Sequence, residues 1–277
     1  MTINIFQFHY DQASKAMLDP GFMPLEIVGN PRSDWREYWG IRHYFLENVL
    51  EETSYYGFLS PLFRTKTHLT AKMLASFMKD NPDADVYTFS PSLADSACYL
   101  NVFEHGEKCH PGMLSVTEDF FRHIDVHIDF KSLINDFRTS VFCNYIIAKP
   151  VFWRRWFALT ERIFDIAEYK KNDLSARLNT AASYGKSQVQ TKVFVIERIA
   201  SALLALTPQL KIANYQMPFV PLLYFPCRDE LRMLNALKLA YMKSQRQHYL
   251  DDYLALRQSV LIRCDPEFTD EQHIVQL

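Results

Sequence analysis

Strand-like and helix-like segments alternate over the first 90 residues, and this alternation constrains the fold more than any other feature of the 277-residue chain. Residues 3–8, 55–59 and 85–89 carry the β-branched and aromatic side chains that are typical of strands. Between them, residues 35–50 and 70–79 repeat apolar side chains at helical spacing. The pattern predicts an α/β fold, namely an open, mainly parallel sheet flanked by helices.

The chain after residue 90 is expected to be mainly helical. The polar segment 92–112 predicts a loop with a short helix, and the charged segment 229–261 predicts one long helix. Asp34 and Thr70 are the expected N-caps of the two earlier helices. The remaining expected elements are helices over residues 111–123, 150–169 and 189–206 and strands over residues 142–148 and 210–215.

A domain boundary is expected near residue 216, where the strand-containing pattern ends. Residues 1–216 would form the α/β domain, and residues 217–277 would form a helical C-terminal extension packed on it. The apolar stripe of the long helix needs a partner, which would be either the α/β domain or a second copy of the chain. The second option would make the protein a homodimer.

Glycine is scarce, and its distribution excludes the common phosphate-binding loops. The chain has 7 glycines, and no two of them are spaced to form G-x-G-x-x-G or G-x-x-x-x-G-K-[ST]. Rossmann and P-loop nucleotide sites are therefore not expected. A bound nucleotide would have to be held without a glycine loop.

Charge and cysteine usage narrow the partners and the compartment. The formal net charge is −2, so no basic surplus indicates a nucleic-acid partner. The first residues show no signal-peptide pattern, and no stretch of about 18 apolar residues predicts a transmembrane helix. The five scattered cysteines are typical of free thiols in a reducing compartment. These features predict a cytoplasmic protein.

Five segments, in order and with similar gaps, resemble bacterial glycosyltransferases that are encoded in capsule and O-antigen polysaccharide clusters. The resemblance runs from about residue 3 to residue 215, and it implies a compact GT-A-like catalytic domain. It also implies transfer of a sugar from a nucleotide diphosphate-sugar donor to a glycan or lipid-linked acceptor at the inner face of the membrane. The segments are YYGFLSPLFRTKT (55–67), DADVYTFSP (83–91), NVFEHGEKCHPGM (101–113), FCNYIIAKPVFW (142–153) and KVFVIERIASALL (192–204).

The resemblance predicts a donor site at the carboxyl ends of the strands, where open α/β sheets bind nucleotides. Asp83 and Asp85 have the D-x-D spacing with which many GT-A enzymes hold Mn²⁺ or Mg²⁺ against the sugar diphosphate. These aspartates precede a strand, whereas the usual motif follows one, so a solvated turn is the favoured interpretation. The predicted donor-binding residues are His9, Tyr10, Asp11, Tyr56, Ser60, Lys66, Ser90 and Asn101.

Catalysis of this kind needs a base that takes a proton from the acceptor hydroxyl. Glu107 and His110, in the polar segment, are the predicted catalytic residues, and we expect them to matter more than the D-x-D aspartates. Asn144 and Lys149 bracket a predicted strand beside the crevice and are predicted to position the acceptor.

Two helical features favour structural roles over functional ones. Glu197 and Arg198 are adjacent in an apolar helix, where an anchoring ion pair is preferred to catalysis. The sequence Trp-Arg-Arg-Trp at 153–156 fits an amphipathic helix, and its alternative is a patch that faces an acceptor or, peripherally, a membrane. The alternative to an enzyme is a non-catalytic binding or assembly protein with the same fold.

Overall fold

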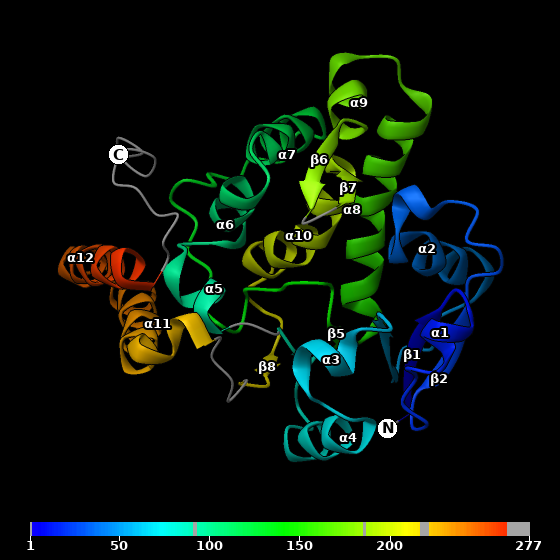
Figure 1. Ribbon diagram of the computed structural model, residues 1–277, viewed down its shortest axis with the longest axis horizontal. Helices are drawn as coiled ribbons and strands as arrows, with labels where there is room; N and C mark the ends of the chain where they lie inside the picture. Colours follow the sequence, from blue (N-terminus) through cyan, green and yellow to red (C-terminus); the bar gives the residue numbers. More distant parts are fainter. Residues whose placement is uncertain (1, 91–92, 185–186, 217–221, 265–277) are drawn as a thin grey trace.

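Strands from distant parts of the sequence form one central sheet. The computed structural model describes residues 2–90, 93–184, 187–216 and 222–264 (Figure 1). It is an α/β fold in which helices flank a mostly parallel, six-stranded sheet of order β2-β1-β3-β5-β4-β8. The strands are β1 (Thr2–His9), β2 (Met23–Glu26), β3 (Ser54–Leu59), β4 (Val86–Thr88), β5 (Ile146–Ala148) and β8 (Ile212–Asn214).

Strand β5 is the antiparallel member of the sheet. It lies between β3 and β4 and runs opposite to both, whereas β1 pairs in parallel with β2 and β3, and β4 pairs in parallel with β8. Gly57 lies opposite Ile147, and a Cβ on Gly57 would come within 2.8 Å of the Ile147 side chain. Glycine at position 57 therefore lets strand β5 approach β3 closely.

Helices connect the strands and cover both faces of the sheet. Pro150 occupies the first turn of α8, and Thr70 caps α4, both as expected. The elements outside the sheet are α1 (Gln12–Lys15), η1 (Ser33–Trp35), α2 (Glu37–Glu47), α3 (Phe63–Thr67), α4 (Ala71–Asp80), α5 (Leu93–Cys98), α6 (Val102–Cys109), α7 (Met113–His123), α8 (Pro150–Tyr169), α9 (Asp173–Leu178), β6 (Ala181–Tyr184), β7 (Ser187–Gln190), α10 (Thr191–Leu206), η2 (Leu222–Cys227), α11 (Arg228–Ser244) and α12 (Gln247–Cys264).

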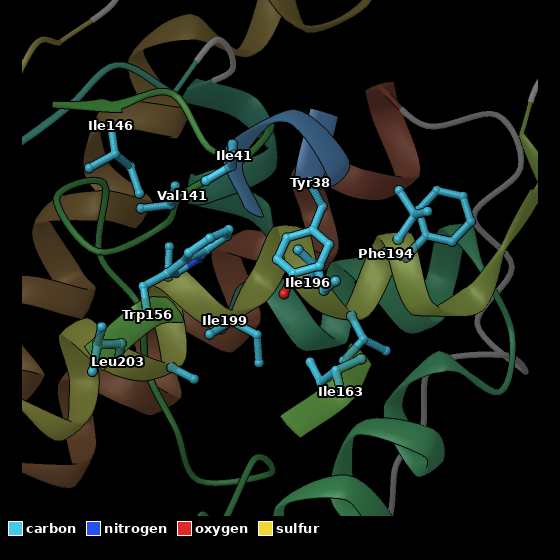
Figure 2. Close-up of a cluster of buried hydrophobic side chains, with 14 of the residues drawn as sticks. Tyr38, Ile41, Val141, Ile146, Trp156, Ile163, Phe194, Ile196, Ile199 and Leu203 are labelled. Atoms are coloured by element: carbon cyan, nitrogen blue, oxygen red, sulfur yellow. The ribbon is translucent and has the colours of Figure 1, made fainter. Parts of the chain in front are cut away.

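Alternating side chains divide the core into two layers. Phe58 and Ile146 point to the face that is covered by α2, α8 and α10, and Figure 2 shows part of this cluster around Trp156 and Ile199. On the other face, Leu59 joins a second cluster with residues of α3 and α4. Burial on both faces explains why the central strands β3, β4 and β5 are almost continuously apolar rather than alternating apolar and polar.

The C-terminal part is a pair of helices rather than the single long helix that we expected. Gln245, with φ of +55°, ends α11, and α12 begins two residues later. Both helices pack with α5 in a third cluster, on the side of the molecule away from α2 (Figure 1). Residues 217–221 and 265–277 of the expected extension lie outside the described residues.

Three other expectations need correction. The segment 92–112 is mostly helical, because α5 and α6 occupy it. Asp34 lies within η1 and does not cap α2, whose N-cap is Arg36. Cys227 and Cys264 form a disulfide between the start of α11 and the end of α12, so not all five cysteines are free thiols. Among the described residues, no helix combines the length and apolarity needed to cross a membrane.

Candidate functional site

The carboxyl ends of β1, β3 and β4 meet at one edge of the sheet, as do the residues that precede β5. Because β5 is antiparallel, its first residues lie at this edge and its last residues lie at the opposite one. This topology brings Tyr10, Ser60, Ser90 and Asn144 to the same edge, where open α/β sheets bind ligands. Pro91 and Ser92, which follow Ser90, lie outside the described residues.

A narrow cavity opens at this edge between the sheet, the start of α2 and α10. The centres of water-sized molecules can occupy about 20 Å³ of it. Apolar side chains such as Phe58 and Ile196 form part of the wall. Its polar lining consists of Arg36, Glu37, Ser60, Cys143, Asn144 and Glu197. The cavity is far smaller than the pockets of about 300–1,000 Å³ that enclose whole small molecules, but convergent polar groups beside apolar side chains are a common feature of ligand sites.

Glu197 is the most unusual group in the cavity. Its side chain is partly buried and, among the described residues, its carboxylate has no hydrogen-bond or ion-pair partner. Burial raises the pKa of Glu197 above its ordinary value, and the nearby Glu37 carboxylate raises it further, although Arg198 opposes the rise. A carboxylate that is partly buried without a partner lowers the stability of the folded protein. A functional role therefore explains Glu197 better than a structural one.

Arg36 stands at the mouth of the cavity in a strained backbone conformation. Its φ and ψ are +50° and −139°, a region that essentially only glycine adopts without strain. Its side chain is exposed and makes no hydrogen bond or ion pair with the described residues. The adjacent Glu37 lies near Tyr10. Burial is the main cause that raises the pKa of the Tyr10 hydroxyl, and the Glu37 carboxylate raises it further.

A turn before β5 supplies the opposite wall. Cys143 and Asn144 have φ of +60° and +52°, so two consecutive residues are left-handed. The ammonium of Lys66 lies 3.4 Å from the Cys143 sulfur, which brings Lys66 close to the cavity. Burial raises the pKa of the Cys143 thiol to about 11. The Ser60 hydroxyl is 2.7 Å from that of Tyr145, which fixes its orientation.

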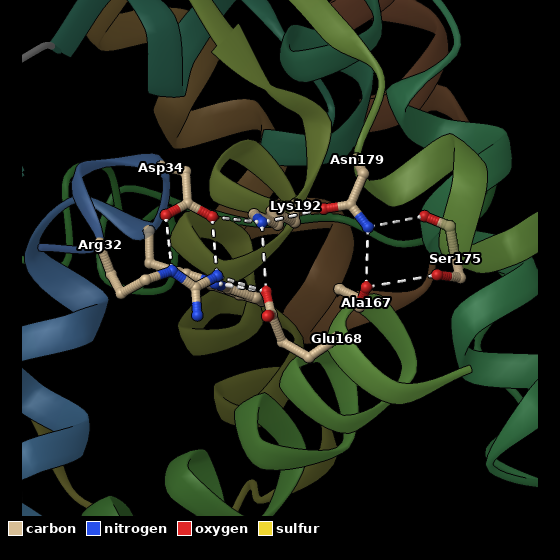
Figure 3. Close-up of polar contacts among 8 residues, drawn as sticks. Arg32, Asp34, Ala167, Glu168, Ser175, Asn179 and Lys192 are labelled. Carbon is tan, nitrogen blue, oxygen red and sulfur yellow. Dashed lines mark hydrogen bonds and ion pairs between the residues drawn. The ribbon is translucent and has the colours of Figure 1, made fainter. Parts of the chain in front are cut away.

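An ion-pair network fixes the chain just before Arg36 (Figure 3). Arg32 contacts Asp34 at 2.9 Å and Glu168 at 2.6 Å, and the Trp35 indole N–H donates to Glu168. The buried Lys192 of α10 contacts Asp34 at 2.8 Å and lies over the Trp35 ring. Since α10 also carries Glu197, the network holds two walls of the cavity together.

Replacement of Lys192 by methionine is expected to lower the free energy of unfolding by about 2 kcal/mol, because a buried charge-assisted contact is lost. Burial would raise the pKa of Asp34, but hydrogen bonds from Arg32 and Lys192 outweigh it and lower the pKa to about 2. This stabilisation is therefore complete above about pH 4 and is lost as the pH falls through about 2. Urea denaturation against pH would measure both effects, with the exposed Lys170→Met as control.

A loss in the control as large as that in Lys192→Met would contradict this role for the network. An unchanged acid dependence in Lys192→Met would contradict it as well, because Asp34 would then not depend on Lys192.

The predicted catalytic pair lies elsewhere. The Glu107 carboxylate accepts hydrogen bonds of 2.7 Å from the Gly112 and Leu114 N–H groups and thereby caps the start of α7. The buried His110 ring stacks on Phe194, with centroids 3.6 Å apart. Neither residue lines the cavity, so the structure does not bring the predicted catalytic pair to this site. This segment was expected to be a loop with a short helix, whereas α5 and α6 occupy most of it, and Glu107 lies within α6.

Asn101 and several other predicted donor contacts have structural partners. Asn101 is the N-cap of α6 and also donates to two carbonyl oxygens at 2.8 Å. The carboxylate of Asp11 caps α1, the Ser90 hydroxyl donates to the Ser140 carbonyl, and the buried His9 ends β1. These four side chains explain local structure and do not line the cavity.

The opposite edge of the sheet holds the remaining predicted residues. The Lys149 ammonium contacts the Asp85 carboxylate at 2.8 Å, and Asp85 also accepts from the Lys211 N–H. Tyr56 accepts from the Glu51 N–H at the same edge, away from the cavity. Asn144 and Lys149 are therefore at opposite ends of β5, and they cannot position one acceptor together.

The D-x-D aspartates do not fit a divalent cation. Asp83 is exposed, and Asp85 is already neutralised by Lys149, which a cation would have to displace. In the part of the chain that the structure describes, no three His, Cys, Asp or Glu side chains gather as a metal site.

A second hollow, at the opposite edge, has a different character. Its lining is largely apolar and includes Phe45, Val49 and Trp153, and its one charged side chain, Arg154, is paired with Glu52. Trp153 and Trp156 are fully buried, so they do not form a patch that faces a membrane or an acceptor. The cavity at the carboxyl edge is therefore the better candidate site.

Sequence reasoning missed Arg36 and Glu37 and gave Glu197 a structural role. A glutamate within the otherwise apolar sequence KVFVIERIASALL was the available signal for Glu197. Arg36 offered no comparable signal, because its strained backbone is visible only in three dimensions.

Comparison of the chain with protein-family models, with curated proteins and with solved structures finds no match in any of the three. The geometry of the cavity is therefore the basis on which a function can be argued.

Proposed function

We propose that the protein is a glycosyltransferase whose reaction takes place at the cavity on the carboxyl edge of the sheet. It would move a sugar from a nucleotide diphosphate-sugar to a hydroxyl group of a glycan or lipid-linked acceptor. The proposal is carried by one observation: the cavity is lined by the Glu197 carboxylate and by Arg36, and neither has a hydrogen-bond or ion-pair partner among the described residues.

In the proposed step, an acceptor oxygen forms a bond to the anomeric carbon of the donor sugar while the bond from that carbon to the diphosphate oxygen breaks. The diphosphate leaves with the electron pair, and Glu197 takes the proton of the acceptor hydroxyl. A raised pKa suits this role, because a base works best when its pKa lies near the working pH.

The placement of the cavity residues in the sequence supports the same proposal. Ser60, Lys66, Asn144 and Glu197 all belong to segments that resemble the polysaccharide glycosyltransferases. Three segments that are far apart in the sequence thus bring polar side chains to the cavity or next to it. Because the cavity is narrow, the proposal has the reacting atoms at its mouth and the nucleotide outside it, along the sheet edge.

Cys143 offers a direct test of binding, because its thiol lines the cavity and Cys109 is exposed elsewhere. Because the pKa of the Cys143 thiol is raised and the cavity is narrow, labelling should use a small thiol reagent, methyl methanethiosulfonate, at about pH 9. We expect saturating donor to slow the labelling of Cys143 several-fold and to leave Cys109 unaffected. Mass spectrometry of labelled peptides, with uridine, guanosine and thymidine diphosphate sugars in turn, would identify the donor. Release of nucleoside diphosphate in the presence of acceptor would then establish turnover.

Equal protection of both cysteines would indicate general stabilisation rather than binding at the cavity. Protection of Cys143 without release of nucleoside diphosphate for any donor and acceptor would support the alternative, a binding protein that has kept the fold.

A further inference from the structure

We infer that the mouth of the cavity is a diphosphate site in which Arg36 and Lys66 neutralise the charge that a divalent cation would otherwise carry. The identity of the ligand as a sugar nucleotide rests on the proposed function, but the anion site stands on its own residues. The inference replaces the Mn²⁺ or Mg²⁺ site expected at Asp83 and Asp85.

The position of Arg36, exposed and beside the cavity, suits a cation that binds an anionic ligand. Its guanidinium is exposed beside the cavity, and among the described residues nothing pairs with it, although arginines at Arg32 and Arg42 nearby are paired with carboxylates. The strained backbone gives no structural benefit that we can identify, and strain of this kind is usually retained for function. The ion-pair network of Arg32, Asp34, Glu168 and Lys192 holds that backbone in place.

Lys66 approaches the cavity from the opposite side, through its contact with Cys143. Both cations act on the same carboxylate: burial raises the pKa of Glu197, and Lys66 and Arg36 each oppose that rise. Arg36 lines the cavity directly and Lys66 contacts Cys143, which also lines it, so the two cations approach the cavity from the residue before α2 and from α3. A diphosphate between them would receive charge-assisted hydrogen bonds from two directions, with the guanidinium able to bind two oxygens at once.

The aspartates of the D-x-D sequence lie at the wrong place for this ligand. Asp85 and its partner Lys149 are at the amino edge of β4, whereas the cavity is at the carboxyl edge. A cation held there would not reach a diphosphate at Arg36. The residues that are present thus favour neutralisation by side chains.

Isothermal titration calorimetry with inorganic pyrophosphate would test the site. We expect the full-length protein to bind pyrophosphate equally well with manganese and with chelator. Loss of one charge-assisted contact in Arg36→Gln or Lys66→Met should weaken binding roughly 10- to 100-fold. Arg64→Gln is the matched control, because Arg64 is an exposed cation on the same short helix as Lys66 and does not line the cavity. Its affinity should equal that of the wild type.

Arg36→Gly separates the anion site from protein stability. Glycine adopts the backbone conformation of residue 36 without strain, so Tm should rise by roughly 2–4 °C. Pyrophosphate binding should nevertheless fall as far as it does in Arg36→Gln. A variant that is more stable and yet binds less cannot be explained by misfolding.

Three outcomes would overturn the inference: no pyrophosphate binding, binding that requires manganese and is lost in Asp85→Asn, or wild-type affinity in Arg36→Gln. Each differs from failure of the proposed function. If pyrophosphate binds as expected but no donor is turned over, the anion site stands and the transferase proposal fails. If sugar nucleotides protect Cys143 equally in wild type and Arg36→Gln, the transferase proposal stands and the anion site fails.

Discussion

Replacement of Glu197 by glutamine is expected to lower turnover of the donor roughly 10²–10⁴-fold, the usual cost of losing a general base. The change is nearly isosteric, and the carboxylate has no hydrogen-bond or ion-pair partner among the described residues, so the fold should remain intact. Nucleoside diphosphate release under saturating donor would measure the loss. In the wild type, turnover should increase with pH as Glu197 loses its proton, and the raised pKa moves this increase above the range of an ordinary glutamate.

The same substitution is expected to stabilise the protein. Because the pKa of Glu197 is higher in the folded than in the unfolded state, the ionised carboxylate costs stability as the pH rises through the folded pKa. Glu197→Gln should therefore be more stable than the wild type at neutral pH and similar to it in acid. Glu107→Gln is the contrasting control: it should lose about 1 kcal/mol of stability with its cap and keep its turnover. Full activity in Glu197→Gln would refute the assigned role.

Replacement of Lys238 by methionine should cause the largest loss of stability, about 3–5 kcal/mol, because several buried carbonyl oxygens would each lose a donor at a cost of about 1–3 kcal/mol. Lys238 of α11 is buried, and its ammonium donates to the carbonyl oxygens of Ser96 and Asn135 at 2.7 and 3.0 Å. It also donates to the carbonyl of Tyr99, just past the end of α5. The substitution would leave these buried acceptors without a donor and would loosen the C-terminal helices from α5.

Urea denaturation would measure this loss, and limited proteolysis would show whether α11 and α12 become accessible before the rest of the protein. The exposed Lys243, also on α11, provides the control variant Lys243→Met, for which we expect almost no effect. An equal loss of unfolding free energy in the two variants would mean that the buried contacts of Lys238 do not hold α11 and α12 against α5.

Local sequence signals predicted the elements whose causes are local. Thr70 starts α4 because its hydroxyl oxygen accepts from the Met73 N–H, and Pro150 fits the first turn of α8, where a backbone N–H is not needed; both helix starts agree with the sequence prediction. Strands β1 and β3 were likewise visible from their β-branched and aromatic side chains. The antiparallel direction of β5 was not predictable in this way, because it depends on pairing with strands about 60 to 90 residues away.

The candidate site was only partly predictable for a related reason. Glu197 and Arg198 were interpreted as a pair, but consecutive helical residues point in directions about 100° apart. Arg198 donates to the carbonyl oxygen of Val102, whereas Glu197 faces the cavity. Ser60 and Asn144 were predicted to belong to a ligand site, but the tertiary structure alone shows that they share it with Arg36.

The position of β5 also has a consequence for the order of folding. Until residues 146–148 are available, β3 and β4 have no strand between them, and each has an unpaired edge on that side. Pairings between such distant residues are slow to form, so we expect partly folded chains to expose strand edges and to aggregate readily at high concentration. Because one wall of the cavity precedes β5 and another comes from α10, the cavity should be completed late, after the central strand has been inserted.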